Sequence, residues 1–115
     1  MTSEFNPHPS LWVRVQVEPG AMDEFEAWYR EVHLPHVLGI PGIVRGWRVR
    51  GAHDPAGTHL MMFEFADNAA VQPALASDEA QLARRDWDRW RAQLQELSAE
   101  IYTPLGPIDT YHHRN

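Results

Sequence analysis

The spacing of hydrophobic residues changes along this chain in an order that few folds can accommodate. In "LWVRVQVE" (residues 11–18) apolar and polar side chains alternate, which predicts a strand. After the strand-breaking "PG" at 19 and 20, apolar residues recur at helical spacing, at Met22, Phe25, Trp28, Tyr29 and Val32. Pro35 has no N–H and disfavours helical geometry in the residue before it, so this helix is expected to end near His33.

The rest of the chain repeats the pattern. Residues 43–52 and 58–66 read as two strands, which pair as a hairpin through the turn "HDPAG". Asp67 and Asn68 can cap a short helix that contains Pro73, and Ser77 can start a longer one. The apolar stripe of the longer helix is Ala83, Trp87, Trp90, Leu94 and Leu97. Residues 101–111 contain two prolines, which suit an edge strand.

The resulting order, β-α-β-β-α-β, is that of the ferredoxin-like α+β fold, a four-stranded antiparallel sheet with helices on one face. The length of 115 residues fits one domain spanning 1–115, with residues 1–10 expected to be loose.

The other face of this sheet is expected to be apolar as well. Trp12, Leu60 and Met62 alternate out of phase with Val13 and Phe63, so each face receives large apolar side chains. One chain of this length has no third layer to cover the second face. We therefore expect a homodimer in which two sheets face each other and enclose a cavity.

Composition excludes several classes of protein. The chain has no cysteine and a formal net charge of −6, which argues against disulfides, thiolate chemistry and binding to nucleic acid or anionic membranes. No window approaches a membrane span and the start does not resemble an export signal, so a cytoplasmic location is expected. Phosphate-binding, serine-hydrolase and zinc-protease motifs are also absent from the sequence.

The stretch "FEAWYREVHLPHVLGIPGIVRG" carries a His-x-Pro motif (33–35) followed by Ile-Pro-Gly (40–42). With "HLMMFEF" and "YTPLGPI", it resembles the EthD-like branch of the dimeric α+β barrel superfamily over roughly residues 11–111. The resemblance implies a homodimer with a small-molecule pocket in each half, and it places His33 at the motif histidine. The superfamily includes cofactor-free monooxygenases, polyketide cyclases, lactone isomerases and haem-degrading enzymes, so it does not select a reaction.

His33 can be interpreted in two ways. Imidazole titrates near neutral pH and can move a proton in either direction, so His33 is a candidate general acid or base. The alternative is a histidine that only satisfies carbonyls at the end of a helix. In an ideal helix His33 lies about 80° from Phe25 and flanks the buried stripe. Arg14 or Tyr29 would then stabilise a developing oxyanion.

The remaining candidates line the expected barrel cavity. Arg14 and Glu64 share a strand face; an ion pair between them is the structural alternative to a ligand contact, and a buried Glu64 could itself be a base. His36 is either a second pocket histidine or a surface loop residue. A metal site is not expected, since no carboxylate lies at a suitable third position. The predicted substrate-binding residues are Trp12, His36, Trp47, Leu60, Met62 and Glu64.

The functional prediction is a cofactor-independent isomerase, cyclase or lyase for an apolar, aromatic or enolisable metabolite, with no cofactor and with His33, Arg14 and Tyr29 as catalytic residues. The alternatives are a cofactor-free monooxygenase of the same fold and a non-catalytic metabolite-binding or accessory protein.

Overall fold

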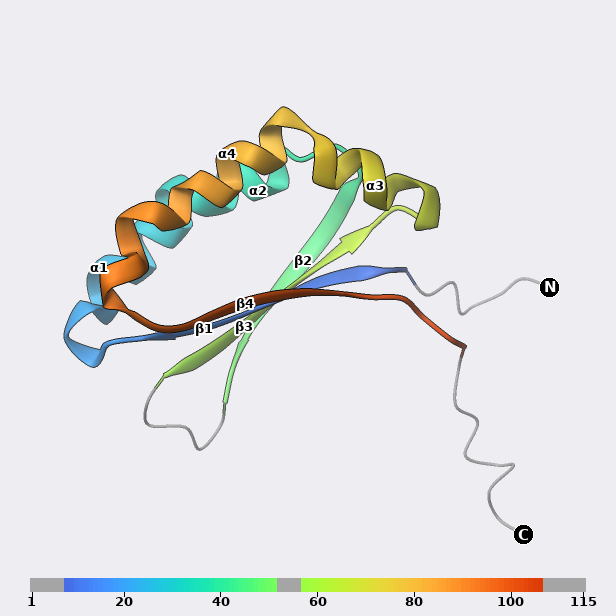
Figure 1. The fold of residues 1–115 in the computed structure, drawn as a ribbon. Coiled ribbons are helices and arrows are strands. Elements are labelled where there is room, and N and C mark those ends of the chain that lie inside the picture. Colours follow the sequence, from blue (N-terminus) through green and yellow to red (C-terminus); the bar gives the residue numbers. More distant parts are fainter. Residues whose placement is uncertain (1–7, 52–56, 107–115) are drawn as a thin grey trace, which may run out of the picture.

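The computed structural model describes residues 8–51 and 57–106, and its core element is an antiparallel sheet. The four strands are β1 (Ser10–Val17), β2 (Ile43–Arg50), β3 (Thr58–Phe65) and β4 (Leu94–Tyr102), in the order β2-β3-β1-β4. The helices α1 (Met22–Trp28), α2 (Leu34–Leu38), α3 (Asn68–Ala76) and α4 (Asp78–Asp86) cover one face (Figure 1). The ferredoxin-like prediction is confirmed.

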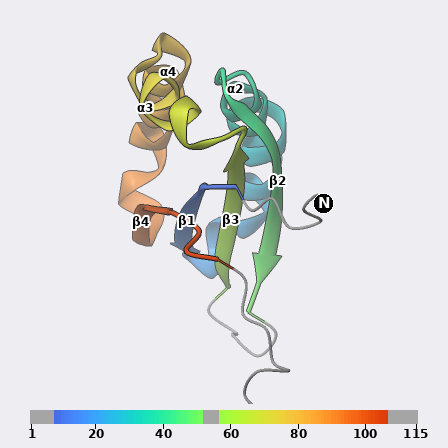
Figure 2. The ribbon, with the colours of Figure 1, turned by 90° about the vertical axis from the view of Figure 1, so that its right-hand side faces the viewer.

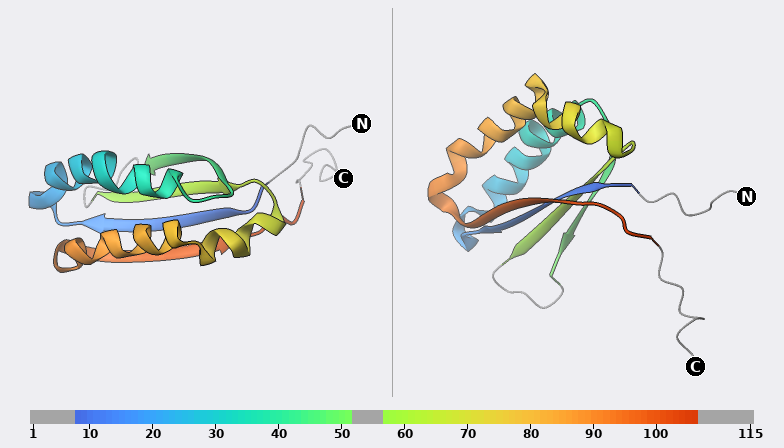
Figure 3. Two further views of the ribbon diagram at one scale, coloured as in Figure 1. Left: turned by 90° about the horizontal axis from the view of Figure 1, so that it is seen from above. Right: turned by 45° about the vertical axis from the view of Figure 1, so that its right-hand side comes forward.

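The helices form two rows that run side by side over the sheet (Figure 3). One row is α1 and α2, above β2 and β3; the other is α3 and α4, toward β4 (Figure 2). A short 3-10 turn, Pro19–Ala21, joins β1 to α1. The turn between β2 and β3 was predicted at residues 53–57, of which 53–56 lie outside the described residues, as do residues 1–7 of the expected loose start.

The prediction that the first helix ends near His33 is wrong. The helix continues from α1 through one π-helical turn, Tyr29–His33, into α2 and ends at Leu38. In this turn the Leu34 N–H bonds the Tyr29 carbonyl, five residues back. The wider turn lets Pro35 enter the first turn of α2, where a missing N–H breaks no helical hydrogen bond.

The π turn also changes which side chains are buried. It acts as one extra residue, so it rotates the following positions by about 100° relative to an unbroken helix. His33, expected to flank the buried stripe, is only 4% exposed, whereas Val32, expected within the stripe, is 39% exposed. The rotation thus turns a histidine, in place of a valine, toward the interior.

The start sites of the later helices agree with the sequence. The Asp67 carboxylate accepts from the Ala70 N–H at the start of α3, which contains Pro73. The Ser77 hydroxyl accepts from the Ala80 N–H at the start of α4. Both caps satisfy N–H groups that a helix cannot pair internally.

The end of the second main helix and the fourth strand were mispredicted. Helix α4 ends at Asp86, a 3-10 segment (Trp87–Gln93) follows, and β4 begins at Leu94 rather than at residue 101. Residues 107–111 of the predicted strand lie outside the described residues. Leu94 and Leu97 both pack against the core although they are three residues apart, because the register of β1 and β4 shifts at Gln16/Val17. A bulge of this kind reproduces helical spacing within a strand.

The strand phase was predicted correctly. Side chains under the helices are buried and include Val13, Val15, Val17, Met61, Phe63 and Phe65. The opposite side of the sheet, called the open face below, carries Trp12, Arg14, Trp47, Leu60, Met62 and Glu64. On it, Trp47 and Val49 are 49% and 52% exposed.

Candidate functional site

A cavity of about 460 Å³ lies between the helices and the sheet of a single chain. Its lining is mostly apolar and comes from all four strands and from both helical rows, with Leu11, Val37, Ile40, Met61, Phe63, Leu75, Trp87 and Leu97 among the residues. The volume lies within the range of small-molecule pockets, roughly 300–1,000 Å³. The sequence predicted a cavity between two sheets, and the structure instead places this one inside the monomer.

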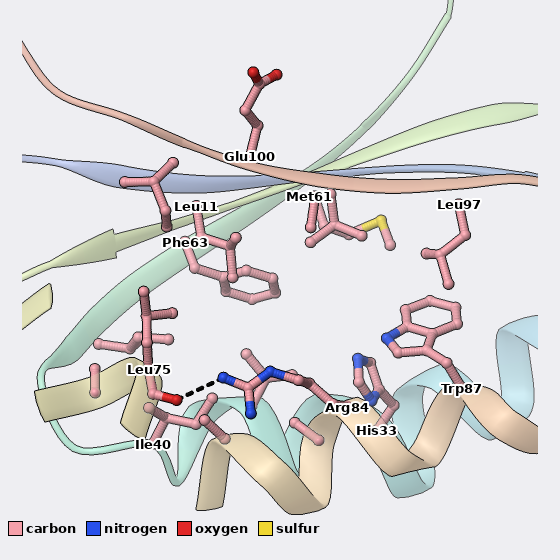
Figure 4. A pocket seen from close by; sticks show the side chains of 18 of the residues that line it. Leu11, His33, Ile40, Met61, Phe63, Leu75, Arg84, Trp87, Leu97 and Glu100 are labelled. Atoms are coloured by element: carbon pink, nitrogen blue, oxygen red, sulfur yellow. Dashed lines mark hydrogen bonds between the residues drawn. The ribbon is translucent and has the colours of Figure 1, made fainter. Parts of the chain in front are cut away.

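His33 reaches the cavity from the helical layer, beside Trp87 and opposite Met61 and Leu97 (Figure 4). Its Nδ1 lies 2.8 Å from Asp86 Oδ2, at the end of α4. Both side chains are buried, with 5% and 8% exposed. A carboxylate only accepts, so His33 Nδ1 carries the hydrogen and the neutral ring keeps its lone pair on Nε2. In the described part of the chain Nε2 has no hydrogen-bond partner.

Aromatic rings hold the imidazole on its other sides. The Trp28 ring stacks on it at 5.2 Å between centroids and 11° between planes, and Trp87 meets it edge-on at 4.7 Å. Burial lowers the pKa of His33 below its ordinary value, and this effect outweighs the raising effect of Asp86. The His33 ring is therefore held in one orientation and is neutral at neutral pH. The alternative that it satisfies carbonyls at a helix end does not match this geometry.

Tyr29, one turn before His33, also lines the cavity and is completely buried. Its hydroxyl has no hydrogen-bond partner in the described part of the chain, which is unusual for a buried polar atom. Burial raises the pKa of the phenol, more than the nearby Arg48 lowers it. The hydroxyl therefore stays protonated and can donate.

Arg48 supports Tyr29 from the sheet. Its guanidinium carbon lies 4.5 Å from the centre of the Tyr29 ring, and Nη2 donates to both Glu26 carboxylate oxygens at 2.9 Å. The structure shows ion pairs within the chain, Arg48 with Glu26 and Arg45 with Glu64.

Two arginines line the cavity, Arg84 and Arg91, and Arg91 is paired with Asp88 at 3.1 Å. The Arg84 side chain runs along the helical side of the cavity and donates to the Leu75 carbonyl (Figure 4). Arg84 is also exposed to solvent, so it marks a side on which the cavity opens. Glu100, although part of the lining, points away from the cavity toward the open face (Figure 4).

The structure brings only part of the predicted site together. His33 and Tyr29 line the cavity. His36 is not among the lining residues, but it contacts Asp86, the partner of His33. The other predicted residues, Trp12, Arg14, Trp47, Leu60, Met62 and Glu64, lie on the open face. The ion pair between Arg14 and Glu64, given above as the structural alternative, is not formed. Arg14 pairs with Glu96 on β4 at 3.1 Å, and Glu64 pairs with Arg45 at 3.0 Å.

Sequence reasoning missed Asp86 and Arg84. Both belong to α4, about fifty residues from His33, and nothing near them in the sequence marks them as site residues. The only available signal was their polarity beside the apolar stripe of that helix.

Among the described residues, no group of three or more His, Cys, Asp or Glu side chains could hold a metal ion. In the same part of the chain, no helix has the length and hydropathy needed to cross a membrane.

Comparison with solved structures identifies this architecture. An EthD family protein from Bacillus halodurans is 18% identical, with a TM-score of 0.63 over 80% of this chain and 96% of that one. The fold is that of the EthD and antibiotic biosynthesis monooxygenase proteins. The fold that this resemblance implied is thereby confirmed.

Two other similar structures belong to proteins named for a chemistry. SnoaB from Streptomyces nogalater, a cofactor-independent oxygenase, is 19% identical, with a TM-score of 0.63 over 89% of this chain and 98% of that one. An antibiotic biosynthesis monooxygenase is 17% identical, with a TM-score of 0.63 over 85% and 99%. At these identities the similarity shows the fold alone. No family model and no curated protein matches the sequence.

Proposed function

We propose that this protein is a cofactor-independent enzyme that removes a proton from a small, apolar, enolisable or aromatic substrate in the cavity between helices and sheet. The observation that carries the proposal is the buried His33–Asp86 pair, which directs an unpaired imidazole nitrogen at an apolar cavity. Such a pair is the arrangement used for general acid–base catalysis.

The proposed reaction starts when His33 Nε2 accepts a proton from a carbon beside a carbonyl, or from a phenol. Asp86 then stabilises the imidazolium ion through Nδ1–H. The negative charge that develops on the substrate oxygen receives a hydrogen bond from Tyr29 and the positive field of Arg84. In this scheme Arg84 takes the role that the sequence had suggested for Arg14.

The fate of the enolate decides the reaction class. Return of the proton from His33 to another carbon gives isomerisation, attack on a second carbonyl of the same molecule gives cyclisation, and loss of a group from the neighbouring carbon gives elimination. The second candidate is cofactor-free oxygenation, in which the substrate carbanion itself reacts with dioxygen. The similarity in fold to the oxygenase SnoaB favours this variant.

We also propose that two copies pack through the open face. Trp12, Arg14, Leu60 and Tyr102 surround a hollow of about 610 Å³ on this face, next to the exposed Trp47. Large exposed aromatic side chains on a sheet face, here Trp47 and Tyr102, are typical of an interface. The dimer would cover the open face and leave the proposed catalytic cavity within each chain.

The test is ligand-induced thermal stabilisation of the wild type and of His33→Gln, with a panel of phenols, β-keto acids and lactones. A ligand at about 100 times its Kd adds roughly 2.7 kcal/mol of stability. The proposal expects a ligand that stabilises both proteins and is converted only by the wild type. Oxygen consumption during conversion would assign the monooxygenase variant. Equal binding without conversion by either protein would contradict an enzyme and support a binding protein.

A further inference from the structure

His36 is a half-exposed histidine in contact with the buried pair at the cavity. Its Nδ1 lies 2.8 Å from Asp86 Oδ2, the same oxygen that accepts from His33, also at 2.8 Å. The His36 side chain is 34% exposed, whereas the other two side chains are buried. One carboxylate oxygen thus connects an imidazole that lines the cavity with an imidazole that reaches solvent.

Helix geometry explains this arrangement. His33 and His36 are three residues apart, so they project from the same side of the helix, toward α4. The π turn that buries His33 therefore directs His36 to the same neighbour. Asp86 is the last residue of α4 and lies opposite both.

A shared oxygen makes the two hydrogen bonds interdependent. Each Nδ1–H withdraws electron density from the same atom, so a strong bond to one imidazole weakens the acceptor for the other. The effect is largest in a buried site, where water does not compensate for the loss. The state of His36 must therefore influence how firmly Asp86 holds His33.

Other charged groups nearby are engaged elsewhere or exposed. Arg84 donates to the Leu75 carbonyl, and Arg89 donates to Glu24 at 3.3 Å. Arg30 and Glu31, in the π turn, and Arg85, beside Asp86, are exposed, and in the described residues no ion pair joins either arginine to Asp86. The two histidines are thus the titratable partners of this carboxylate.

We propose that His36 is a positioning residue that acts on His33 through Asp86, so that solvent conditions at the surface set the orientation and basicity of the cavity imidazole. Only the catalytic consequence of this coupling rests on the proposed function. The coupling itself is a property of three side chains and can be measured without a substrate.

The experiment is a pH titration of the protein with ¹⁵N-labelled histidine, followed by NMR of the imidazole nitrogens. The His33 signals are assigned by their loss in His33→Gln. In the wild type, neutral His33 should carry its hydrogen on Nδ1. Positive charge on His36 lowers the pKa of His33, so His36→Ala should shift the His33 midpoint upward. His36→Gln retains an N–H donor without the charge, and separates the two contributions.

Leu38→Ala is the matched control, since Leu38 is 51% exposed on the same helix. It should leave the His33 titration unchanged. A His33 midpoint and tautomer that are the same in wild type, His36→Ala and His36→Gln would overturn the inference, even if the protein is an enzyme. A shifted midpoint in a protein that converts no substrate would retain the coupling and count against the proposed function.

Discussion

Removal of the unpaired Tyr29 hydroxyl should change catalysis without lowering the stability of the fold. In Tyr29→Phe the ring and its contact with Arg48 remain, and a buried polar atom without a partner is removed. Chemical denaturation should show an unchanged free energy of unfolding, or an increase of up to about 1 kcal/mol. Turnover should fall by about 100-fold, as for loss of one oxyanion donor.

Tyr102→Phe is the control, because the Tyr102 hydroxyl donates to Glu100 at 3.1 Å and Tyr102 is not part of the cavity lining. This variant should keep the wild-type turnover. A Tyr29→Phe enzyme with full turnover would remove the hydroxyl from the mechanism.

The pH dependence of activity should follow the titration of His33. Proton abstraction requires the neutral imidazole, so kcat/KM falls as pH drops through the pKa of His33. Burial lowers this pKa, and the midpoint of the acidic limb should lie below the ordinary value of 6.5. A pH–rate profile of the free enzyme measures it. A midpoint above 6.5 would mean that Asp86 outweighs burial, contrary to this account.

At the scale of the elements, the loop between α2 and β2 depends on a glycine. Gly42 has a φ of +97°, and a Cβ there would lie 3.2 Å from the Ala70 Cβ on α3. Gly42→Ala should therefore lower the free energy of unfolding by about 1–3 kcal/mol. Gly39, three residues earlier, has an ordinary φ of −82°. In Gly39→Ala the same denaturation measurement should give no change or a gain of up to about 1 kcal/mol; equal losses in both variants would contradict the argument.

The elements also show where sequence reasoning reaches its limit. The alternation of apolar and polar residues in 11–18 and 58–66 predicted both strands and the side chains that share each face. Alternation fixes the face because a shift of one residue would move every side chain to the opposite side of the sheet. The π turn at 29–33 had no sequence signal, since Pro35 by itself predicts a helix end. The bulge in β4 next to Leu94 also had no sequence signal, because the three-residue spacing of Leu94 and Leu97 fits a helix as well.

The same limit applies to the candidate site. His33 and Tyr29 could be proposed because they lie in one short stretch with a recognisable motif. Asp86 could not, because its role arises only when α4 packs beside α2. The position of the cavity depends on the space between helices and sheet, which periodicity does not describe. For this reason the residues predicted to line the barrel lie on the expected face of the sheet, but outside the cavity.

For the whole molecule, the exposed aromatic side chains of the open face predict a homodimer. Trp47 is a large, half-exposed aromatic residue there, and such residues contribute strongly to interfaces. Sedimentation equilibrium should show a wild-type dimer and at least about 30-fold weaker association for Trp47→Glu. Leu82→Glu changes a residue on α4 that is 41% exposed and should remain dimeric. A wild-type monomer at all concentrations would reject the dimer.

In the proposed mechanism His33 moves a substrate proton within the cavity. The most direct measurement is proton NMR in D₂O of the panel ligands that bind, which follows deuterium incorporation at the acidic carbon. We expect exchange above the buffer rate with the wild type, and exchange slower by about 100-fold or more with His33→Gln. Exchange at the same rate in both proteins, with the ligand bound equally, would contradict this mechanism.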